Sequence, residues 1–210
     1  LISALGDSVE FYKLGLEVFL SGHYFELMAE LKGKGKKVFA DLKLFDIPAT
    51  VAAAVRQLSR HEVDFCTVHG NDSMLKAAAD AKGNMQILAV TALTSLDQGD
   101  LDDLGFQCDA RTLVLSRAKR ALALGCDGVV SSGMEVGALR EHASPRLITV
   151  CPGIRPIHND DDQQRVMTPF QAIKDGADYL VVGRPIRAAS DPASAAEAIQ
   201  EDISRALASD

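Results

Sequence analysis

The chain has 210 residues, 47% of them hydrophobic, which is enough for one α/β domain with its own core. Its formal net charge of −7 disfavours binding through a nucleic-acid backbone, whereas a few placed cations still allow a small anionic ligand. No segment reads as a membrane span or a signal peptide, so we expect a cytoplasmic protein.

Short apolar runs typical of buried parallel strands alternate with helix-like segments along the whole chain. The predicted strands are residues 11–16, 38–42, 63–69, 86–91, 128–131, 147–151 and 179–183. Helical patterns between them cover residues 51–60, 73–81, 111–124 and 134–142. Thr168-Pro169 and Asp191-Pro192 predict two more helix starts, each with a capping side chain followed by proline.

This alternation, with no linker-like tract, predicts a single (β/α)8 TIM-barrel domain over residues 1–210. An open doubly wound sheet is the main alternative. Only seven strands are visible, and residues 1–6 resemble the end of a helix. Because a seven-stranded remnant would leave sheet edges that a closed barrel avoids, we expect that the sequence begins after the first strand of the barrel.

The four cysteines are spaced too widely for a CxxC metal or redox pair. Buried, reduced thiols of a cytosolic protein explain them better, and no metal site is expected from them. They are Cys66, Cys108, Cys126 and Cys151.

Several charged residues interrupt the apolar runs near their C-terminal ends, where barrel enzymes carry their chemistry. Lys13 lies in the first run, Asp41 and Lys43 end the second, and His69 closes the third. Asp41 and Lys43 are two residues apart, so both should point to the same face of a strand. Because a buried, unpaired charge is expensive, we expect these groups to meet one another.

A structural ion pair is the simpler explanation for one Asp–Lys pair taken alone. Two lysines and two acids at one strand-end site favour a functional cluster. For His69 the simpler interpretation is stronger, since a lone histidine at a strand end is more often a hydrogen-bonded structural residue than a catalyst.

The last two strands are followed by candidates for a phosphate site, as in many barrels. Gly183 allows the backbone to approach an oxyanion, and Arg184 can add charge-assisted hydrogen bonds. The polar loop between Arg155 and Thr168 offers Gln163 as an amide donor, although an ordinary surface loop would have a similar composition.

The segment Asp41-Leu42-Lys43-Leu44-Phe45-Asp46-Ile47-Pro48-Ala49-Thr50 resembles the DxKxxDIPxT signature of the orotidine 5′-phosphate decarboxylase family. Weaker matches follow the family's order over nearly the whole chain. They are residues 11–17, 90–95, 152–156, 162–163, 167–169 and 182–186.

The resemblance implies a homodimer of barrels that converts orotidine 5′-phosphate to UMP and CO2, the final step of de novo UMP synthesis, without a cofactor or metal. It makes Lys43 the group that stabilises and protonates C6. Lys13 and Asp41 would complete the site of the same subunit, while Asp46, with Ile47 and Thr50, would reach into the partner's site.

The resemblance also assigns the remaining ligand contacts. The residues that would contact the pyrimidine ring or the phosphate side are Thr94, Arg155, Gln163, Gly183 and Arg184. An Asp that ends the family's first strand and contacts the ribose has no counterpart in this sequence. Two alternatives stay open: a metal-dependent sugar-phosphate decarboxylase or aldolase on a related barrel, and a non-catalytic barrel that binds nucleotide phosphate.

Overall fold

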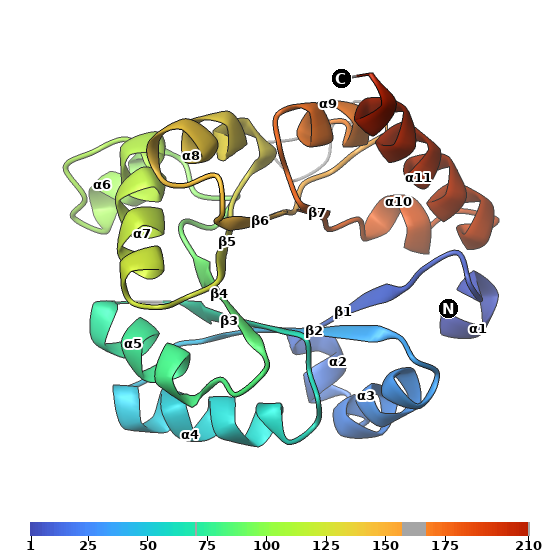
Figure 1. Ribbon diagram of the computed structural model, residues 1–210, viewed down its shortest axis with the longest axis horizontal. Coiled ribbons are helices and arrows are strands. Elements are labelled where there is room, and N and C mark those ends of the chain that lie inside the picture. Colours follow the sequence, from blue (N-terminus) through green and yellow to red (C-terminus); the bar gives the residue numbers. More distant parts are fainter. Residues whose placement is uncertain (70, 157–166, 210) are drawn as a thin grey trace. The chain divides into compact units, whose positions relative to one another are not determined.

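The computed structural model describes residues 1–69, 71–156 and 167–209. The elements in chain order are α1 (Ile2–Leu5), β1 (Phe11–Gly15), α2 (Leu16–Leu20), α3 (Tyr24–Gly33), β2 (Lys37–Leu44), α4 (Pro48–Ser59), β3 (Phe65–His69), α5 (Asp72–Ala81), β4 (Gln86–Val90), α6 (Gln98–Asp103), α7 (Ala110–Ala123), β5 (Gly128–Val130), the 3-10 helix η1 (Gly133–Glu135), α8 (Val136–His142), β6 (Ile148–Cys151), α9 (Pro169–Lys174), β7 (Tyr179–Leu180), α10 (Arg184–Arg187) and α11 (Pro192–Ala208). Strand order in the sheet follows chain order from β1 to β7 (Figure 1).

The pairs β1–β2, β2–β3, β3–β4 and β6–β7 are all parallel. Parallel strands that alternate with helices in chain order have the topology of a (β/α)8 barrel, and the described residues contain seven of its strands. The fold class predicted from the sequence, a TIM barrel, is therefore confirmed. No helix in the described residues is long and apolar enough to cross a membrane.

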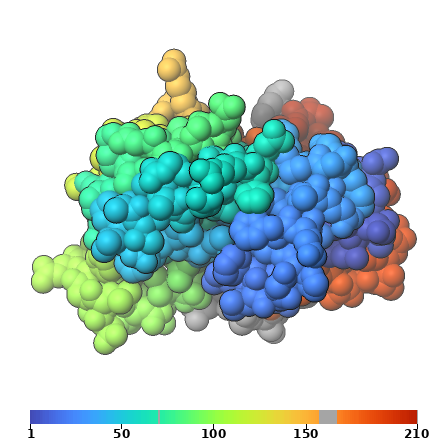
Figure 2. Space-filling view, turned by 90° about the horizontal axis from the view of Figure 1, so that it is seen from below, coloured from blue at the N-terminus to red at the C-terminus, as the bar shows by residue number. Residues whose placement is uncertain are grey.

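Contacts divide the chain into two compact units. Unit 1 consists of Leu1–Val9, Thr91–Ser116 and Val130–Asp210, and unit 2 of Glu10–Val90 and Arg117–Val129. In unit 2, α4 and α5 pack side by side next to β2 and β3 (Figure 1). Figure 2 shows the helical face of unit 2, where α3, α4 and α5 form a continuous surface. In unit 1, α11 contacts α1, α9 and α10.

An aromatic layer lies on one face of the strands of unit 2. The Phe65 ring lies 4.9 Å from the Phe11 ring and 5.9 Å from the Phe39 ring, measured between centroids. Because side chains alternate along a strand, Lys13 and Asp41 lie on the same face, two residues further along β1 and β2. The aromatic layer therefore lies next to the charged residues, on the side of the strand starts.

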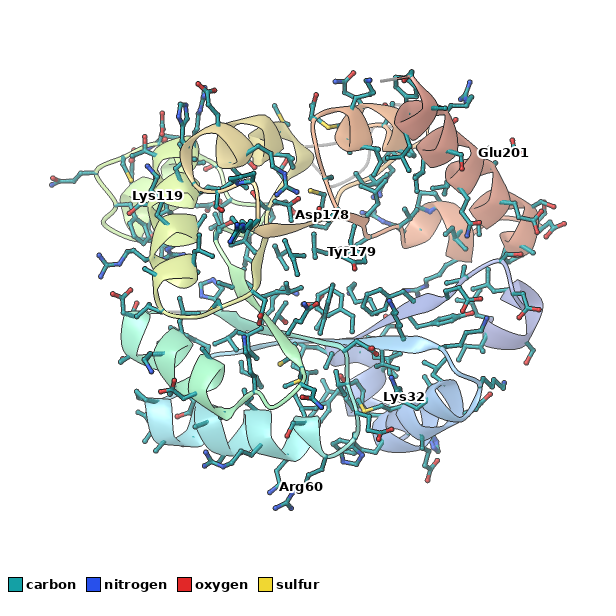
Figure 3. The ribbon with its side chains drawn as sticks, in the orientation of Figure 1. Lys32, Arg60, Lys119, Asp178, Tyr179 and Glu201 are labelled. Carbon is teal, nitrogen blue, oxygen red and sulfur yellow. The ribbon has the colours of Figure 1, made fainter. Side chains whose placement is uncertain are left out.

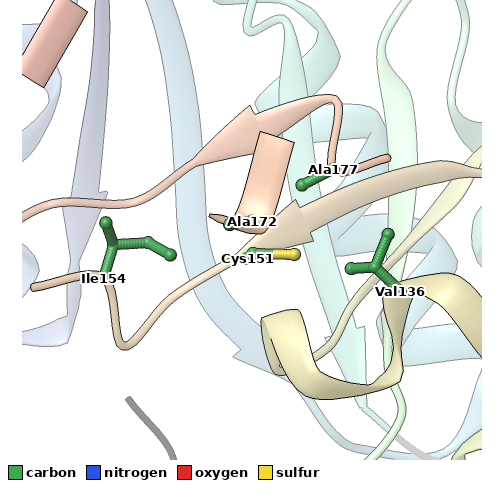
Figure 4. Packing of buried hydrophobic residues seen from close by; sticks show 5 residues of the cluster. All are labelled: Val136, Cys151, Ile154, Ala172 and Ala177. Carbon is green, nitrogen blue, oxygen red and sulfur yellow. The ribbon is translucent and has the colours of Figure 1, made fainter. Parts of the chain in front are cut away.

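Unit 1 has a small apolar cluster around the end of β6, drawn in Figure 4. Its members are Val136, Cys151, Ile154, Ala172 and Ala177. Cys66, Cys126 and Cys151 are buried and no cysteine forms a disulfide, as expected for core thiols.

A repeated polar arrangement fixes the N-terminal ends of the strands. In each case an aspartate just before a strand accepts the backbone N–H of the second residue of the preceding strand, and also pairs with a cation. There are three such sets in the described residues, each given as aspartate, backbone donor and cation: Asp64, Val38 and Lys32; Asp127, Ile87 and Lys82; and Asp178, Thr149 and Arg140. Figure 3 labels Lys32 on α3 and Asp178 before β7. These bonds hold neighbouring strands in register at the end opposite to the expected chemistry.

The seven predicted strands all exist, with shifted ends. Strand β2 continues to Leu44, two residues beyond its predicted end, whereas β7 ends at Leu180 and its predicted last three residues are irregular. Both predicted helix caps are confirmed: Thr168 accepts the N–H of Gln171, and Asp191 accepts the N–H of Ser194.

Candidate active site

A buried carboxylate links two lysines near the C-terminal ends of β1 and β2. Asp41 Oδ2 accepts a hydrogen bond from Lys13 Nζ at 2.9 Å, and Asp41 Oδ1 accepts one from Lys43 Nζ at 2.9 Å. Asp41 is only 8% exposed, whereas about a third of each lysine side chain is accessible (33% and 34%). The predicted meeting of these three residues is therefore confirmed, and the two cations face solvent over a buried anion.

The environment of Asp41 keeps it ionised. Burial is the largest effect and would raise its pKa, but the charges and hydrogen bonds of Lys13 and Lys43 lower it, and the net pKa of Asp41 lies below its usual value. Among the described residues no second carboxylate pairs with either lysine. Two ammonium groups against one carboxylate leave an excess positive charge, which suits an anionic ligand.

The second acid expected in this cluster, Asp46, does not join it within the single chain. Asp46 is exposed, and its Oδ1 accepts the N–H of the adjacent Ile47 at 2.6 Å instead of a lysine. The physical reason is the chain direction: β2 ends at Leu44, and residues 45–47 form a loop that leads into α4 at Pro48. Asp46 is therefore carried away from Asp41 by the loop.

Lys43 reaches Asp41 by an irregularity of β2 and not by regular alternation. Strand β2 pairs Ala40 with Cys66 and next pairs Leu44 with Val68, so residues 41–43 lie opposite one residue of β3. This is a β-bulge, a device that redirects side chains and is frequent next to active sites. Within it Lys43 has a φ of 48°, a left-handed conformation that costs a non-glycine residue roughly 1–3 kcal/mol.

Thr67 is the residue of β3 that lies opposite the bulge, and sequence reasoning missed it. Its hydroxyl donates to Asp41 Oδ1 at 3.0 Å and accepts the backbone N–H of Lys43 at 2.9 Å. The side chain is completely buried. The available signal was a hydroxyl residue in the otherwise apolar run before His69, two residues away and therefore on the same strand face.

His69 ends β3 without the hydrogen bond expected of a structural histidine. Its Nδ1 is buried and has no hydrogen-bond partner among the described residues. The ring packs edge-on against Phe45, with centroids 5.4 Å apart. Burial lowers the pKa of His69, and the positive charges of Arg117 and Lys43 lower it further, so the imidazole is neutral at pH 7.

The loop after β2 borders a surface hollow of about 300 Å³. Phe45 and Ile47 are 67% and 66% exposed on this loop, so two large apolar side chains of one short loop are open to solvent. Thr50, in the first turn of α4, is also exposed. The hollow is lined by residues 45–48 together with Asn71, Ser73 and Met74 at the start of α5.

The candidates for the pyrimidine and phosphate contacts belong to unit 1. Thr94 lies in a turn after β4, and Arg184 is the exposed first residue of α10. Gly183 precedes it, with open space where a Cβ would stand. Arg155 is 6% exposed and its guanidinium donates to the carbonyl of Ile154. Gln163 lies outside the described residues.

Within residues 1–69, 71–156 and 167–209, no three His, Cys, Asp or Glu side chains gather closely enough to hold a metal ion. The buried thiols are also unsuited to ligation, since burial raises the pKa of Cys66 to about 12, helped by the nearby Asp41 charge. The polar groups that the described structure brings together are ammonium, carboxylate and hydroxyl groups.

Comparison with known proteins identifies close relatives over nearly the full chain. A protein of Methylococcus capsulatus named orotidine 5′-phosphate decarboxylase is 62% identical over 205 residues, covering 97% of this chain and 85% of that relative. One of Xanthomonas euvesicatoria with the same name is 52% identical, covering 98% of this chain and 86% of the relative.

Solved structures agree with these sequence relatives. Orotidine 5′-phosphate decarboxylase of Lactobacillus acidophilus superimposes with a TM-score of 0.84 at 36% identity, covering 96% of this chain and 91% of that chain. The Pyrococcus horikoshii protein of the same name gives 0.76 at 26% identity, covering 96% and 90%. The sequence model described as orotidine 5′-phosphate decarboxylase / HUMPS family matches residues 1–199. The chain belongs to this enzyme family.

Proposed function

We propose that the protein decarboxylates orotidine 5′-phosphate to UMP and CO2, the last step of de novo UMP synthesis. The observation that carries the proposal is the Lys13–Asp41–Lys43 array at the strand ends, in which two solvent-facing lysines share one buried carboxylate. Relatives support the proposal, because proteins that are 62% and 52% identical to this chain are named orotidine 5′-phosphate decarboxylase.

Lys43 is the proposed catalytic acid. Loss of CO2 from C6 of the pyrimidine leaves the bonding electron pair on C6, with no adjacent group to delocalise it. A pre-placed ammonium group next to C6 stabilises charge that appears only in the transition state, which lowers the barrier selectively. Lys43 then donates a proton to C6. Its left-handed backbone and its bond to Asp41 are the features that would hold the ammonium group in place.

Asp41 is proposed to act on the departing carboxylate. With a lowered pKa it is anionic at neutral pH, so a substrate carboxylate placed beside it is repelled, and this repulsion disappears as neutral CO2 leaves. Lys13, bonded to the other carboxylate oxygen, keeps Asp41 oriented and ionised. The two lysines thus have different tasks, although they contact the same carboxylate.

The complete site is proposed to require a second copy of the chain. Asp46, Ile47 and Thr50 are exposed in the single chain, and within the described residues Asp46 pairs with no lysine. Counting the part of the chain that the structure describes, the Lys13–Asp41–Lys43 array has one more positive than negative charge. A partner's Asp46 delivered to this array would alternate two lysines with two carboxylates, and burial of Ile47 in the interface would remove exposed apolar surface.

Binding of the phosphate is assigned to the loops of unit 1. Arg184 offers an exposed guanidinium suited to bidentate phosphate contact, and Gly183 leaves room for close backbone approach. Arg155 and Gln163 are the further candidates on this side, and Thr94 is the candidate for the pyrimidine ring. Because the phosphate is remote from C6, its binding energy can be used to position the ring over Lys43.

The decisive experiment follows the orotate absorbance of orotidine 5′-phosphate in a chelator-treated mixture. We expect loss of the chromophore with the parent protein, and no turnover with Lys43→Ala, which should still bind UMP because its phosphate contacts remain. The control is Lys76→Ala, an exposed lysine of α5 paired with Asp80. A parent protein that is inactive or active only with added metal would overturn the proposal, as would an active Lys43→Ala variant.

A further inference from the structure

We propose that Thr67 is a positioning residue of this site: its buried hydroxyl holds the β2 bulge in the shape that aims Lys43 and Asp41. The proposal rests on the function proposed above and adds a residue to it. The supporting observation is a pair of hydrogen bonds, through which the Thr67 hydroxyl links the backbone N–H of Lys43 to the carboxylate of Asp41.

The bulge interrupts the regular pairing of β2 with β3 at the place where the charged residues lie. Residues 41–43 lie opposite Thr67 alone, because the pairing resumes at Leu44 and Val68. At this interruption the backbone N–H of Lys43 donates to a side chain of β3, the Thr67 hydroxyl, at 2.9 Å. A left-handed lysine persists only where its surroundings enforce it, and this bond is such a constraint.

The same hydroxyl fixes the carboxylate. A threonine hydroxyl has one hydrogen to donate, and here it is donated to Asp41 Oδ1 at 3.0 Å, the oxygen that also accepts from Lys43 Nζ. Asp41 is therefore held by Lys13 on one oxygen and by Lys43 and Thr67 on the other. Loss of the hydroxyl would release both the strained backbone of Lys43 and one restraint on Asp41.

An ordinary core threonine is the alternative explanation, and the chain contains a matched example. Thr149 on β6 is also completely buried, and its hydroxyl also donates to an aspartate, Asp178 Oδ2, at 3.1 Å. That bond belongs to the strand-start arrangement and not to the strand ends. Thr149→Val therefore removes a comparable hydroxyl without touching the lysine array.

The kinetic test compares Thr67→Val, Thr67→Ser and Thr149→Val. Valine keeps the branched shape and removes the hydroxyl, and we expect kcat to fall about 100-fold, as small misplacements of catalytic groups do, with little change in KM. Serine keeps the hydroxyl and should restore kcat to within about tenfold of the parent. Thr149→Val should lose thermal stability to a similar degree but keep kcat.

Two kinetic outcomes would overturn the inference: an unchanged kcat in Thr67→Val, or equal losses in the valine and serine variants. If the parent protein does not decarboxylate orotidine 5′-phosphate, the proposed function fails, and crystal structures of the same variants then decide the inference. Lys43 should leave its left-handed conformation, or its ammonium group should leave Asp41, in Thr67→Val but not in Thr67→Ser. A valine variant with both features intact would refute the positioning role.

Discussion

At the scale of single residues, the charged array is a balance between burial and pairing. Asp41 is nearly inaccessible, and it is tolerated because both of its oxygens accept hydrogen bonds from lysines. The lysine side chains remain about one-third exposed, so the carboxylate loses more of its contact with water than the ammonium groups do. A ligand that covers the lysines would exclude water from them. Their electrostatic attraction to the ligand would then be stronger, because water would screen it less.

A pH prediction follows from the lowered pKa of Asp41. Burial opposes ionisation, but Lys13 and Lys43 favour it more, so folding stabilises the carboxylate form. The stabilisation is complete above the unfolded pKa of about 3.9 and is lost as the pH falls through the lower, folded value. Urea unfolding should therefore show a smaller loss of stability in acid for Asp41→Asn than for the parent.

At pH 7, Asp41→Asn should lower the free energy of unfolding by about 1–3 kcal/mol, since two neighbouring lysines lose their counter-charge. Asp103→Asn, an exposed carboxylate of α6, is the matched control and should follow the parent at every pH. An acid response of Asp41→Asn identical to the parent's would show that Asp41 does not contribute this stabilisation.

At the scale of elements, the strand starts and the strand ends carry different kinds of polar contact. Aspartates cap backbone groups at the strand starts, whereas the lysine array lies towards the strand ends. Within unit 2, the aromatic layer of Phe11, Phe39 and Phe65 lies between the strand starts and the lysine array. Stability and chemistry should therefore be separable by mutation.

The strand-start arrangement gives a direct prediction. Asp127→Ala removes the acceptor of the Ile87 N–H and the partner of Lys82, so we expect a loss of about 2 kcal/mol in unfolding free energy. The kcat of the folded enzyme should be unchanged. Asp80→Ala, which removes an exposed ion pair with Lys76, is the control and should change stability by less than about 1 kcal/mol. Equal effects of the two variants would contradict a special role for the strand-start aspartates.

Element positions were predictable because they depend on local pattern. Seven apolar runs gave seven strands, and the pairs Thr168-Pro169 and Asp191-Pro192 both start helices. The bulge was not predictable, since it depends on how β2 pairs with β3. A regular strand also places Asp41 and Lys43 on one face, so the sequence led to the correct contact through the wrong backbone geometry.

At the scale of the whole molecule, the proposed site is shared between two copies. If Lys43 and Asp46 act in the same site but come from different chains, each single variant is inactive alone. Mixing Lys43→Ala with Asp46→Ala subunits then restores one unmutated site in each mixed dimer. Random exchange should restore about a quarter of the parent activity per site, measured after co-refolding.

A control for this experiment mixes Lys43→Ala with Asp41→Ala, two residues of the same array in one chain. No activity should return, because every site of the mixed dimer then contains one of the two substitutions. Recovery in the control, or none in the Lys43–Asp46 mixture when the subunits have exchanged, would contradict a site built from two chains.

The sequence by itself determined the βα order, the helix starts and the family signature, because these depend on periodicity and on residue types at fixed spacing. Only the tertiary structure decided which groups meet. It brought Lys13 from β1 and Thr67 from β3 to Asp41, removed Asp46 from that cluster, and placed Lys43 on a left-handed turn of a bulge. Contacts between strands depend on pairing and register, and those are set by packing across the sheet and not by neighbours along the chain.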